Sequence, residues 1–188
     1  MEITFYRKLA NKVADAVIAN AEYSEAEARR IRYGLVCIFS DLYKFILLLI
    51  VFTLFSATLE YLLAFAVILL LRPILGGYHA KNELVCLAVS FITMAISIFA
   101  GRLDIIPGFV QILLAIVLTI TGAVIAPVRT RKVEERTGIY KILAAILTPA
   151  ILLLDYFYIP AQILQVSVVT TYLLSVYQLL KNKLFNNI

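Results

Sequence analysis

Long apolar runs alternate with short polar segments along most of the chain. Six runs approach the roughly 20 apolar residues that a helix needs to cross a bilayer core. They cover residues 34–55, 59–75, 84–100, 109–126, 142–159 and 161–180. The second run is interrupted near its end by Arg72-Pro73, whereas the fourth contains no charged residue. This pattern predicts an all-α, polytopic membrane protein with six transmembrane helices.

The first 32 residues have the different pattern of an amphipathic helix. An apolar residue recurs every four positions, at Phe5, Leu9, Val13 and Val17. Basic side chains lie off this stripe, as in helices that rest on an anionic membrane surface. A second helix is predicted to begin after Ser24, because Glu27 three residues later completes a capping box.

Composition supports one membrane domain. Of the 188 residues, 63% are hydrophobic and only 15% are charged, whereas soluble domains carry about 25% charged residues. We therefore interpret residues 1–188 as a single integral membrane domain. Residues 1–32 form its interfacial segment on the cytoplasmic side, and residues 34–180 form its membrane core.

The basic residues indicate the orientation. If the N-terminus is cytoplasmic, all of the 17 basic residues except Lys44 and Arg102 fall on the cytoplasmic side. The positive-inside rule then predicts that both termini are cytoplasmic. The net charge of +5 follows from this topology, so we expect no nucleic-acid partner.

The segment from Arg72 to Cys86 holds the candidate chemistry. It contains the one histidine of the chain, His79, one of two cysteines, and the pair Gly76-Gly77. Cysteine catalysis needs a thiolate and a base that accepts its proton. In one continuous helix His79 and Cys86 would lie about 10 Å apart along the axis, which is too far for a hydrogen bond. We therefore predict a loop that folds back over a new helix.

Neighbouring residues support that arrangement. Asn82 is a suitable N-cap, so Cys86 would lie in about the first turn, where the helix dipole and Lys81 favour a thiolate. The two glycines permit a tight backbone and offer N–H groups for an oxyanion. Glu83 is a candidate to orient His79. Taken singly, a cysteine here is more often a packing residue and a histidine a solvated one.

Other polar residues have two interpretations. Arg72 either snorkels to the interface or pairs with an acidic substrate tail. Asp41 and Lys44 lie three residues apart inside the first span, where we expect a structural ion pair, with a site-lining role as the alternative. Cys37 lacks glycine and histidine neighbours, and we interpret it as a packing residue.

The arrangement of Arg72, Gly76-Gly77, His79 and Cys86 resembles the accessory gene regulator B family of bacterial quorum sensing. The length, the six spans, the amphipathic start and the basic loop after residue 127 are also similar. The resemblance implies that His79 and Cys86 are a catalytic pair and that Arg72 and Gly77 are needed for activity. It also implies a homodimer in the bacterial cell membrane.

The activity that the resemblance implies is that of a cysteine endopeptidase. It would remove the acidic C-terminal tail of a short precursor peptide through an acyl-enzyme thioester. An internal thiol or hydroxyl would then close a thiolactone or lactone ring. We expect no metal, haem or nucleotide cofactor. The alternatives are a small-peptide or ion transporter and a non-enzymatic membrane adaptor for the precursor, both of which tolerate the loss of Cys86.

Overall fold

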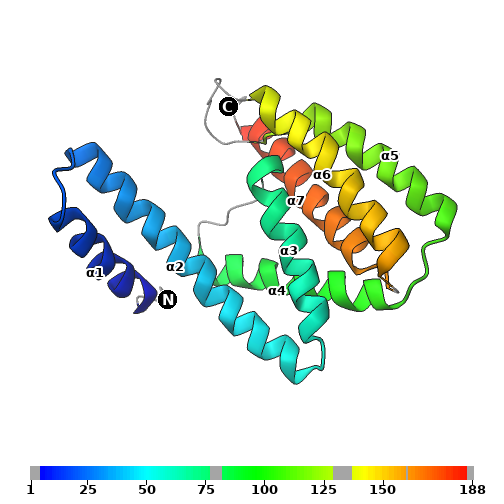
Figure 1. Cartoon of the computed structure of the whole chain (residues 1–188), viewed down its shortest axis with the longest axis horizontal. Helices are drawn as coiled ribbons and strands as arrows, with labels where there is room; N and C mark the ends of the chain where they lie inside the picture. Colours follow the sequence, from blue (N-terminus) through cyan, green and yellow to red (C-terminus); the bar gives the residue numbers. More distant parts are fainter. Residues whose placement is uncertain (1–4, 77–81, 129–136, 160, 186–188) are drawn as a thin grey trace.

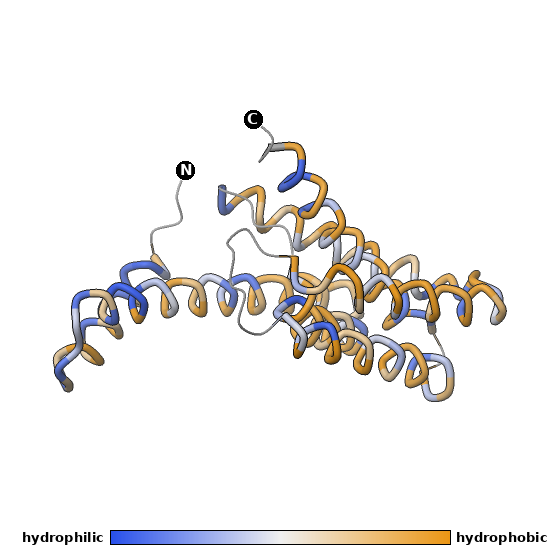
Figure 2. Tube along the Cα trace, turned by 90° about the horizontal axis from the view of Figure 1, so that it is seen from above, coloured by the Kyte–Doolittle hydropathy of each residue, from blue (hydrophilic) through white to orange (hydrophobic). Residues whose placement is uncertain are grey.

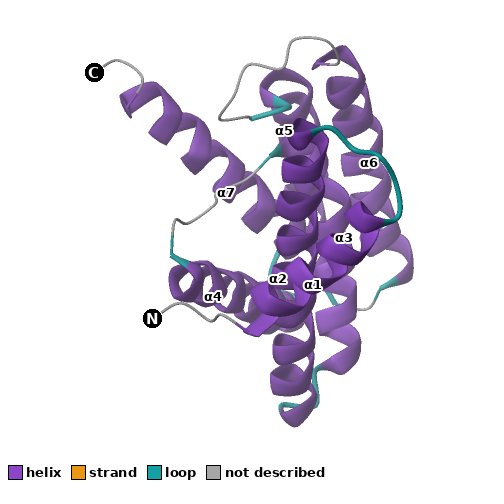
Figure 3. Ribbon diagram, turned by 90° about the vertical axis from the view of Figure 1, so that its left-hand side faces the viewer, coloured by secondary structure: helices purple, strands orange, loops and turns teal. Residues whose placement is uncertain are grey.

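The structure is a computed structural model that describes residues 5–76, 82–128, 137–159 and 161–185. It contains the helices α1 (Phe5–Ala19), α2 (Glu25–Leu54), α3 (Thr58–Leu75), α4 (Glu83–Arg102), α5 (Gly108–Ile125), α6 (Thr137–Tyr158) and α7 (Ile163–Phe185) (Figure 1). Within these ranges Figure 3 shows helices joined by loops and no strand. Helices α2 to α7 are long and apolar enough to cross a membrane. The predicted all-α fold with six transmembrane helices is confirmed.

The N-terminal helix α1 packs along α2. The side chains buried in this contact are Tyr6, Ala10 and Ala14, and the ring of Tyr6 stacks on Tyr43 with centroids 6.2 Å apart. The predicted stripe lies beside this face, and its residues Phe5 and Leu9 are exposed. Hydrophilic positions gather in α1 and the first turns of α2, and hydrophobic positions dominate the remaining helices (Figure 2). Helix α1 is therefore amphipathic as predicted, with a second apolar face against the protein.

Local signals set the beginnings of two helices. The capping box predicted at Ser24 is present: its hydroxyl accepts the N–H of Glu27, and the Glu27 carboxylate accepts the N–H of Ser24 at 2.9 Å. Helix α2 continues from this cap through the first predicted span without a break. The interruption predicted at Arg72-Pro73 falls inside α3. The helix continues past Pro73 and ends two residues later, at Leu75.

Helix α3 lies between two hydrophobic clusters. The first cluster joins α3 to α5, α6 and α7 through residues such as Leu71, Leu118 and Val168. The second joins α3 to α2 and α4 through Phe52, Tyr61 and Ile98. The C-terminal half of α3, which leads to Arg72 and Gly76, packs into the first cluster, and its N-terminal half packs into the second.

Helix α7 buries polar side chains, as helices in the middle of a membrane bundle often do. Ser167 donates to the carbonyl of Ile163 at 2.7 Å, and Ser97 of α4 lies 3.2 Å from Thr170. Asp155 accepts the N–H groups of Leu164 and Gln165 at 3.1 and 3.2 Å. These bonds satisfy the N–H groups at the start of α7 and join the helix to α4 and α6.

Candidate functional site

The end of α3 is fixed by three hydrogen bonds. The Ser175 hydroxyl donates to the Gly76 carbonyl at 2.7 Å, and the N–H of Val128 donates to the Leu75 carbonyl at 2.7 Å. Gly76 has φ +80°, and a Cβ there would collide with the Val128 carbonyl. Glycine is therefore required at this position for both its conformation and its lack of a side chain.

The third bond changes one expectation from the sequence. The N–H of Gly76 donates to the Arg72 carbonyl at 2.9 Å and so completes the last turn of α3. An N–H group that is used in this way is not available to an oxyanion. The expectation that Gly76 supplies such a donor is therefore wrong, and Gly77 lies outside the described residues.

Helix α4 presents Cys86 in its first turn. The Asn82 side chain accepts the N–H of Leu84 at 2.9 Å, which confirms the predicted N-cap. The N–H of Cys86 donates to the Asn82 carbonyl at 3.0 Å, and the cysteine is half-buried. Glu83 lies 3.7 Å from Arg7 of α1, so this ion pair joins the N-terminal helix to the turn that carries the thiol.

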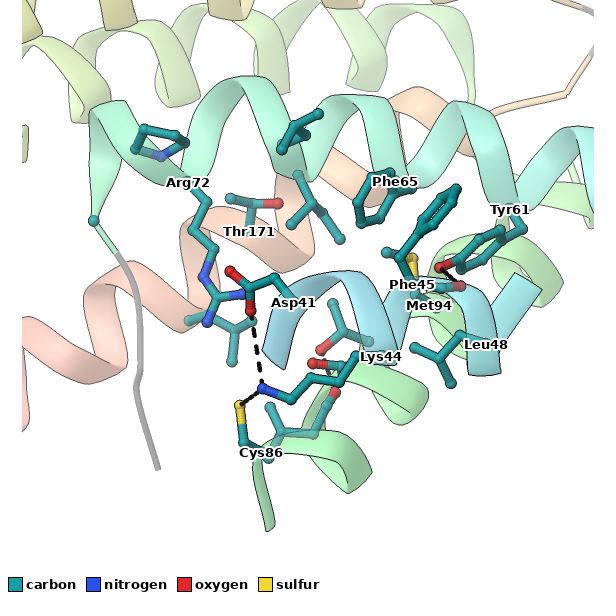
Figure 4. A pocket seen from close by; sticks show the side chains of 18 residues that line it. Asp41, Lys44, Phe45, Leu48, Tyr61, Phe65, Arg72, Cys86, Met94 and Thr171 are labelled. Carbon is teal, nitrogen blue, oxygen red and sulfur yellow. Dashed lines mark hydrogen bonds and ion pairs between the residues drawn. The ribbon is translucent and has the colours of Figure 1, made fainter. Parts of the chain in front are cut away.

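Lys44 of α2 reaches the sulfur of Cys86. Its Nζ lies 3.5 Å from Cys86 Sγ and 3.9 Å from Asp41 Oδ1 (Figure 4). The Lys44 side chain is 14% exposed, whereas that of Asp41 is 70% exposed. The ion pair expected from the sequence is thus present, and its lysine also lines the site. The contact with Cys86 was not predicted, although a lysine inside an apolar span indicates a partner or a cavity.

A cavity of about 320 Å³ opens between α2, α3, α4 and α7. Arg72, Asp41, Lys44 and Cys86 gather at one end, and the Arg72 side chain extends from α3 toward Asp41 (Figure 4). The other end is apolar and aromatic. The site therefore combines a thiol, two cationic groups, a carboxylate and an apolar wall.

The structure places three of the six predicted site residues around this cavity, namely Arg72, Gly76 and Cys86. Glu83 does not line it and pairs with Arg7 instead. His79 and Gly77 lie outside the described residues, as does most of the basic loop between α5 and α6. Cys37 is exposed on α2 and does not line the cavity.

The arrangement suits thiolate chemistry. A cationic group within reach of a cysteine stabilises negative charge on the sulfur, and a partly buried position reduces screening by water. In the described part of the chain no group of three His, Cys, Asp or Glu residues is placed to hold a metal ion.

Comparisons with known proteins agree with the sequence motif. The family model described as Accessory gene regulator B matches residues 8–180. An AgrB-like protein of Clostridium beijerinckii is 34% identical over 84 residues, which are 45% of this chain and 42% of the relative. Protein FsrB of Enterococcus faecalis is 38% identical over 55 residues, which are 29% of this chain and 23% of the relative.

These alignments span less than half the length of either relative. No solved structure matches the chain. The family model, in contrast, covers nearly all of the sequence and includes every helix that lines the cavity. This multi-pass membrane protein belongs to the accessory gene regulator B family, which takes part in quorum-sensing accessory gene regulation.

Proposed function

We propose that this protein is a membrane-embedded cysteine endopeptidase that cuts a quorum-sensing precursor peptide, with Cys86 as the nucleophile. The observation that carries the proposal is the contact of 3.5 Å between Lys44 Nζ and Cys86 Sγ, in a cavity that Arg72 also lines. Family membership supplies the quorum-sensing context.

In the first step the Cys86 thiolate attacks the carbonyl carbon of the scissile bond. A C–S bond forms, the C–N bond breaks, and the tail leaves as an amine after it receives a proton. His79 is the proposed group that takes the thiol proton and returns it to the amine, as a general base and then a general acid. The Lys44 ammonium stabilises the sulfur anion before the attack.

In the second step a thiol or hydroxyl of the precursor attacks the thioester carbonyl. The new C–S or C–O bond closes a ring, the bond to Cys86 breaks, and the thiolate is regenerated while His79 accepts the proton of the attacking thiol or hydroxyl. Exchange of one thioester for another changes the free energy little. Water can attack the same acyl-enzyme, so hydrolysis competes with ring closure. The apolar walls of the cavity support the proposal because they keep water away from the intermediate.

Arg72 is the proposed partner of the acidic tail. A guanidinium binds a carboxylate through two parallel hydrogen bonds, which makes it a strong and oriented partner. Arg72 lies at the polar end of the cavity together with Cys86. The tail would therefore be held beside the bond that is cut.

Two ion pairs, one near each end of α4, support a cytoplasmic location of the site. Helix α1, with its basic residues, touches the first turn of α4 through Arg7 and Glu83. At the other end of α4, Arg102 binds Glu60 of α3 at 2.6 Å. If the basic N-terminal segment is cytoplasmic, the thiol lies on that side of the membrane.

The test is a cleavage assay with purified protein in liposomes, using a short quorum-sensing precursor peptide with an acidic C-terminal tail. Wild type and Cys37→Ala are expected to cut the peptide, whereas Cys86→Ala and His79→Ala are not. Mass spectrometry is expected to find an acyl adduct on the Cys86 peptide. Equal cleavage by all four proteins would overturn the proposal. Binding or transport of the peptide that survives Cys86→Ala without cleavage would favour an adaptor or a transporter.

A further inference from the structure

The cavity extends well beyond the thiol and ends in an aromatic wall. The ring centroids of Phe45 and Phe65 lie 4.6 Å apart, and those of Tyr61 and Phe65 lie 6.0 Å apart. The Tyr61 hydroxyl donates to the Phe45 carbonyl at 3.0 Å. The hydroxyl of this wall is thus already satisfied. Tyr61 itself has no exposed surface, so the half-buried rings of Phe45 and Phe65 are the ones that face the cavity.

Two further side chains complete the apolar end. Leu48 of α2 and Met94 of α4 are each only 4% exposed and line the cavity. The whole cavity of about 320 Å³ is at the lower limit of small-molecule sites, which hold about 300–1,000 Å³. It therefore has room for one or two side chains and not for a folded peptide.

We propose that the apolar end of the cavity binds the side chain of the residue whose carbonyl Cys86 attacks. The protein would then select a large apolar residue, branched or aromatic, immediately before the cut. This inference rests on the proposed function. It adds a specificity site whose accessible surface is made by Phe45 and Phe65, backed by the buried side chains of Leu48, Tyr61 and Met94.

Covalent geometry favours this residue over its neighbour in the substrate. In the thioester the sulfur is bonded to the carbonyl carbon, and the side chain branches from the next atom. That side chain must therefore lie close to Cys86 Sγ throughout the life of the intermediate. The residue after the cut leaves with the tail, so a closed pocket for its side chain would slow its departure.

The charges that line the cavity favour the same orientation of the substrate. Two cationic groups, Lys44 and Arg72, and one carboxylate, Asp41, lie at the end of the cavity that holds Cys86, so positive charge is in excess there (Figure 4). An acidic tail is stabilised there, whereas a carboxylate placed at the aromatic end would lose hydration without gaining a partner. The residue before the cut is then directed toward the aromatic wall.

The experiment uses acetylated aminoacyl chloromethyl ketones in which the amino acid is glycine, leucine, phenylalanine or aspartate. The cysteine sulfur displaces chloride, so a C–S bond forms as the C–Cl bond breaks. Labelling rates at Cys86 and Cys37 are measured by mass spectrometry on full-length protein in phosphatidylglycerol–phosphatidylethanolamine vesicles. Because apolar probes concentrate in the bilayer, the rate at exposed Cys37 corrects for partitioning.

After this correction, the leucine and phenylalanine probes are expected to label Cys86 at least about tenfold faster than the glycine probe, since filling an apolar pocket typically discriminates by that factor or more. Ser90→Phe, whose new ring enters the cavity, is expected to abolish the preference. Ala88→Phe is the matched control, because Ala88 is exposed on the same helix and does not line the cavity.

Equal corrected rates for the glycine, leucine and phenylalanine probes on wild-type protein would overturn the inference. If Cys86→Ala nevertheless abolishes precursor cleavage, the proposed function stands and only the specificity site is lost. If the precursor is cut equally with and without Cys86, the proposed function and this inference fail together. The comparison of probes on wild type needs no variant, so misfolding of Ser90→Phe does not affect the conclusion.

Discussion

Replacing Lys44 by methionine tests whether the lysine activates the thiol. Methionine keeps the length and apolar stem of the side chain and removes the ammonium, which lies 3.5 Å from Cys86 Sγ. At an effective dielectric constant of about 20, two unit charges at this distance attract by roughly 5 kcal/mol. Desolvation of the ammonium and its pairing with Asp41 offset part of this energy.

The net effect is expected to be that of a hydrogen bond to a charged group, about 1.5–3 kcal/mol. Such a loss slows reaction of the sulfur about 10- to 150-fold. The assay is the rate of iodoacetamide labelling at Cys86 in liposomes at neutral pH, with the rate at Cys37 as the internal standard. Lys44→Arg is expected to retain most of the rate, because it keeps a cation near the sulfur.

An unchanged labelling rate at Cys86 in Lys44→Met would refute the reasoning. The contact would then be a packing feature of α2 against α4. A parallel fall in the rate at Cys37 would also count against it, since Cys37 is exposed and does not line the cavity.

Three other predictions concern the end of α3, the start of α7 and the substrate tail. Gly76→Ala is expected to lower the free energy of unfolding by about 1–3 kcal/mol, because of its positive φ and the Val128 carbonyl. Thermal melting in detergent measures this loss; Gly34→Ala has open space around it, and an equal loss there would contradict the explanation. Asp155→Ala is expected to cost about 0.5–2 kcal/mol in the same melts, because α7 loses its N-terminal acceptors, whereas Asp155→Asn is expected to lose less. Arg72→Gln is expected to lower kcat/KM for cleavage at least about tenfold for a precursor with an acidic tail and much less for one with a neutralised tail, and an equal loss for both would argue for snorkelling.

The features that the sequence predicts correctly are those that depend on residues close together in the chain. The six apolar runs, the capping box at Ser24 and the N-cap at Asn82 all arise within one helix or its first turn, and all are present. Cys86 lies in the first turn of α4 for the same reason. The amphipathic nature of α1 was predicted, but periodicity does not say which of two adjacent apolar faces meets the protein.

Features that join distant segments were not predicted. The contact of Lys44 with Cys86 spans 42 positions, and the bond from Ser175 to Gly76 spans 99. Both depend on how α2 and α7 pack against α3 and α4. The role of the Gly76 N–H was mistaken because the sequence shows where a glycine is, but not that α3 continues far enough to use its N–H in the last turn.

The position of Lys44 is itself an argument for function over stability. A lysine inside an apolar membrane helix costs free energy on insertion, and its partner Asp41 is 70% exposed, so their pairing is screened and weak. Replacement of Lys44 by methionine is therefore expected to leave the melting temperature equal or higher while Cys86 becomes less reactive. A structural ion pair predicts the opposite combination, a lower melting temperature with the thiol unaffected. Measuring both quantities on one variant separates the two roles.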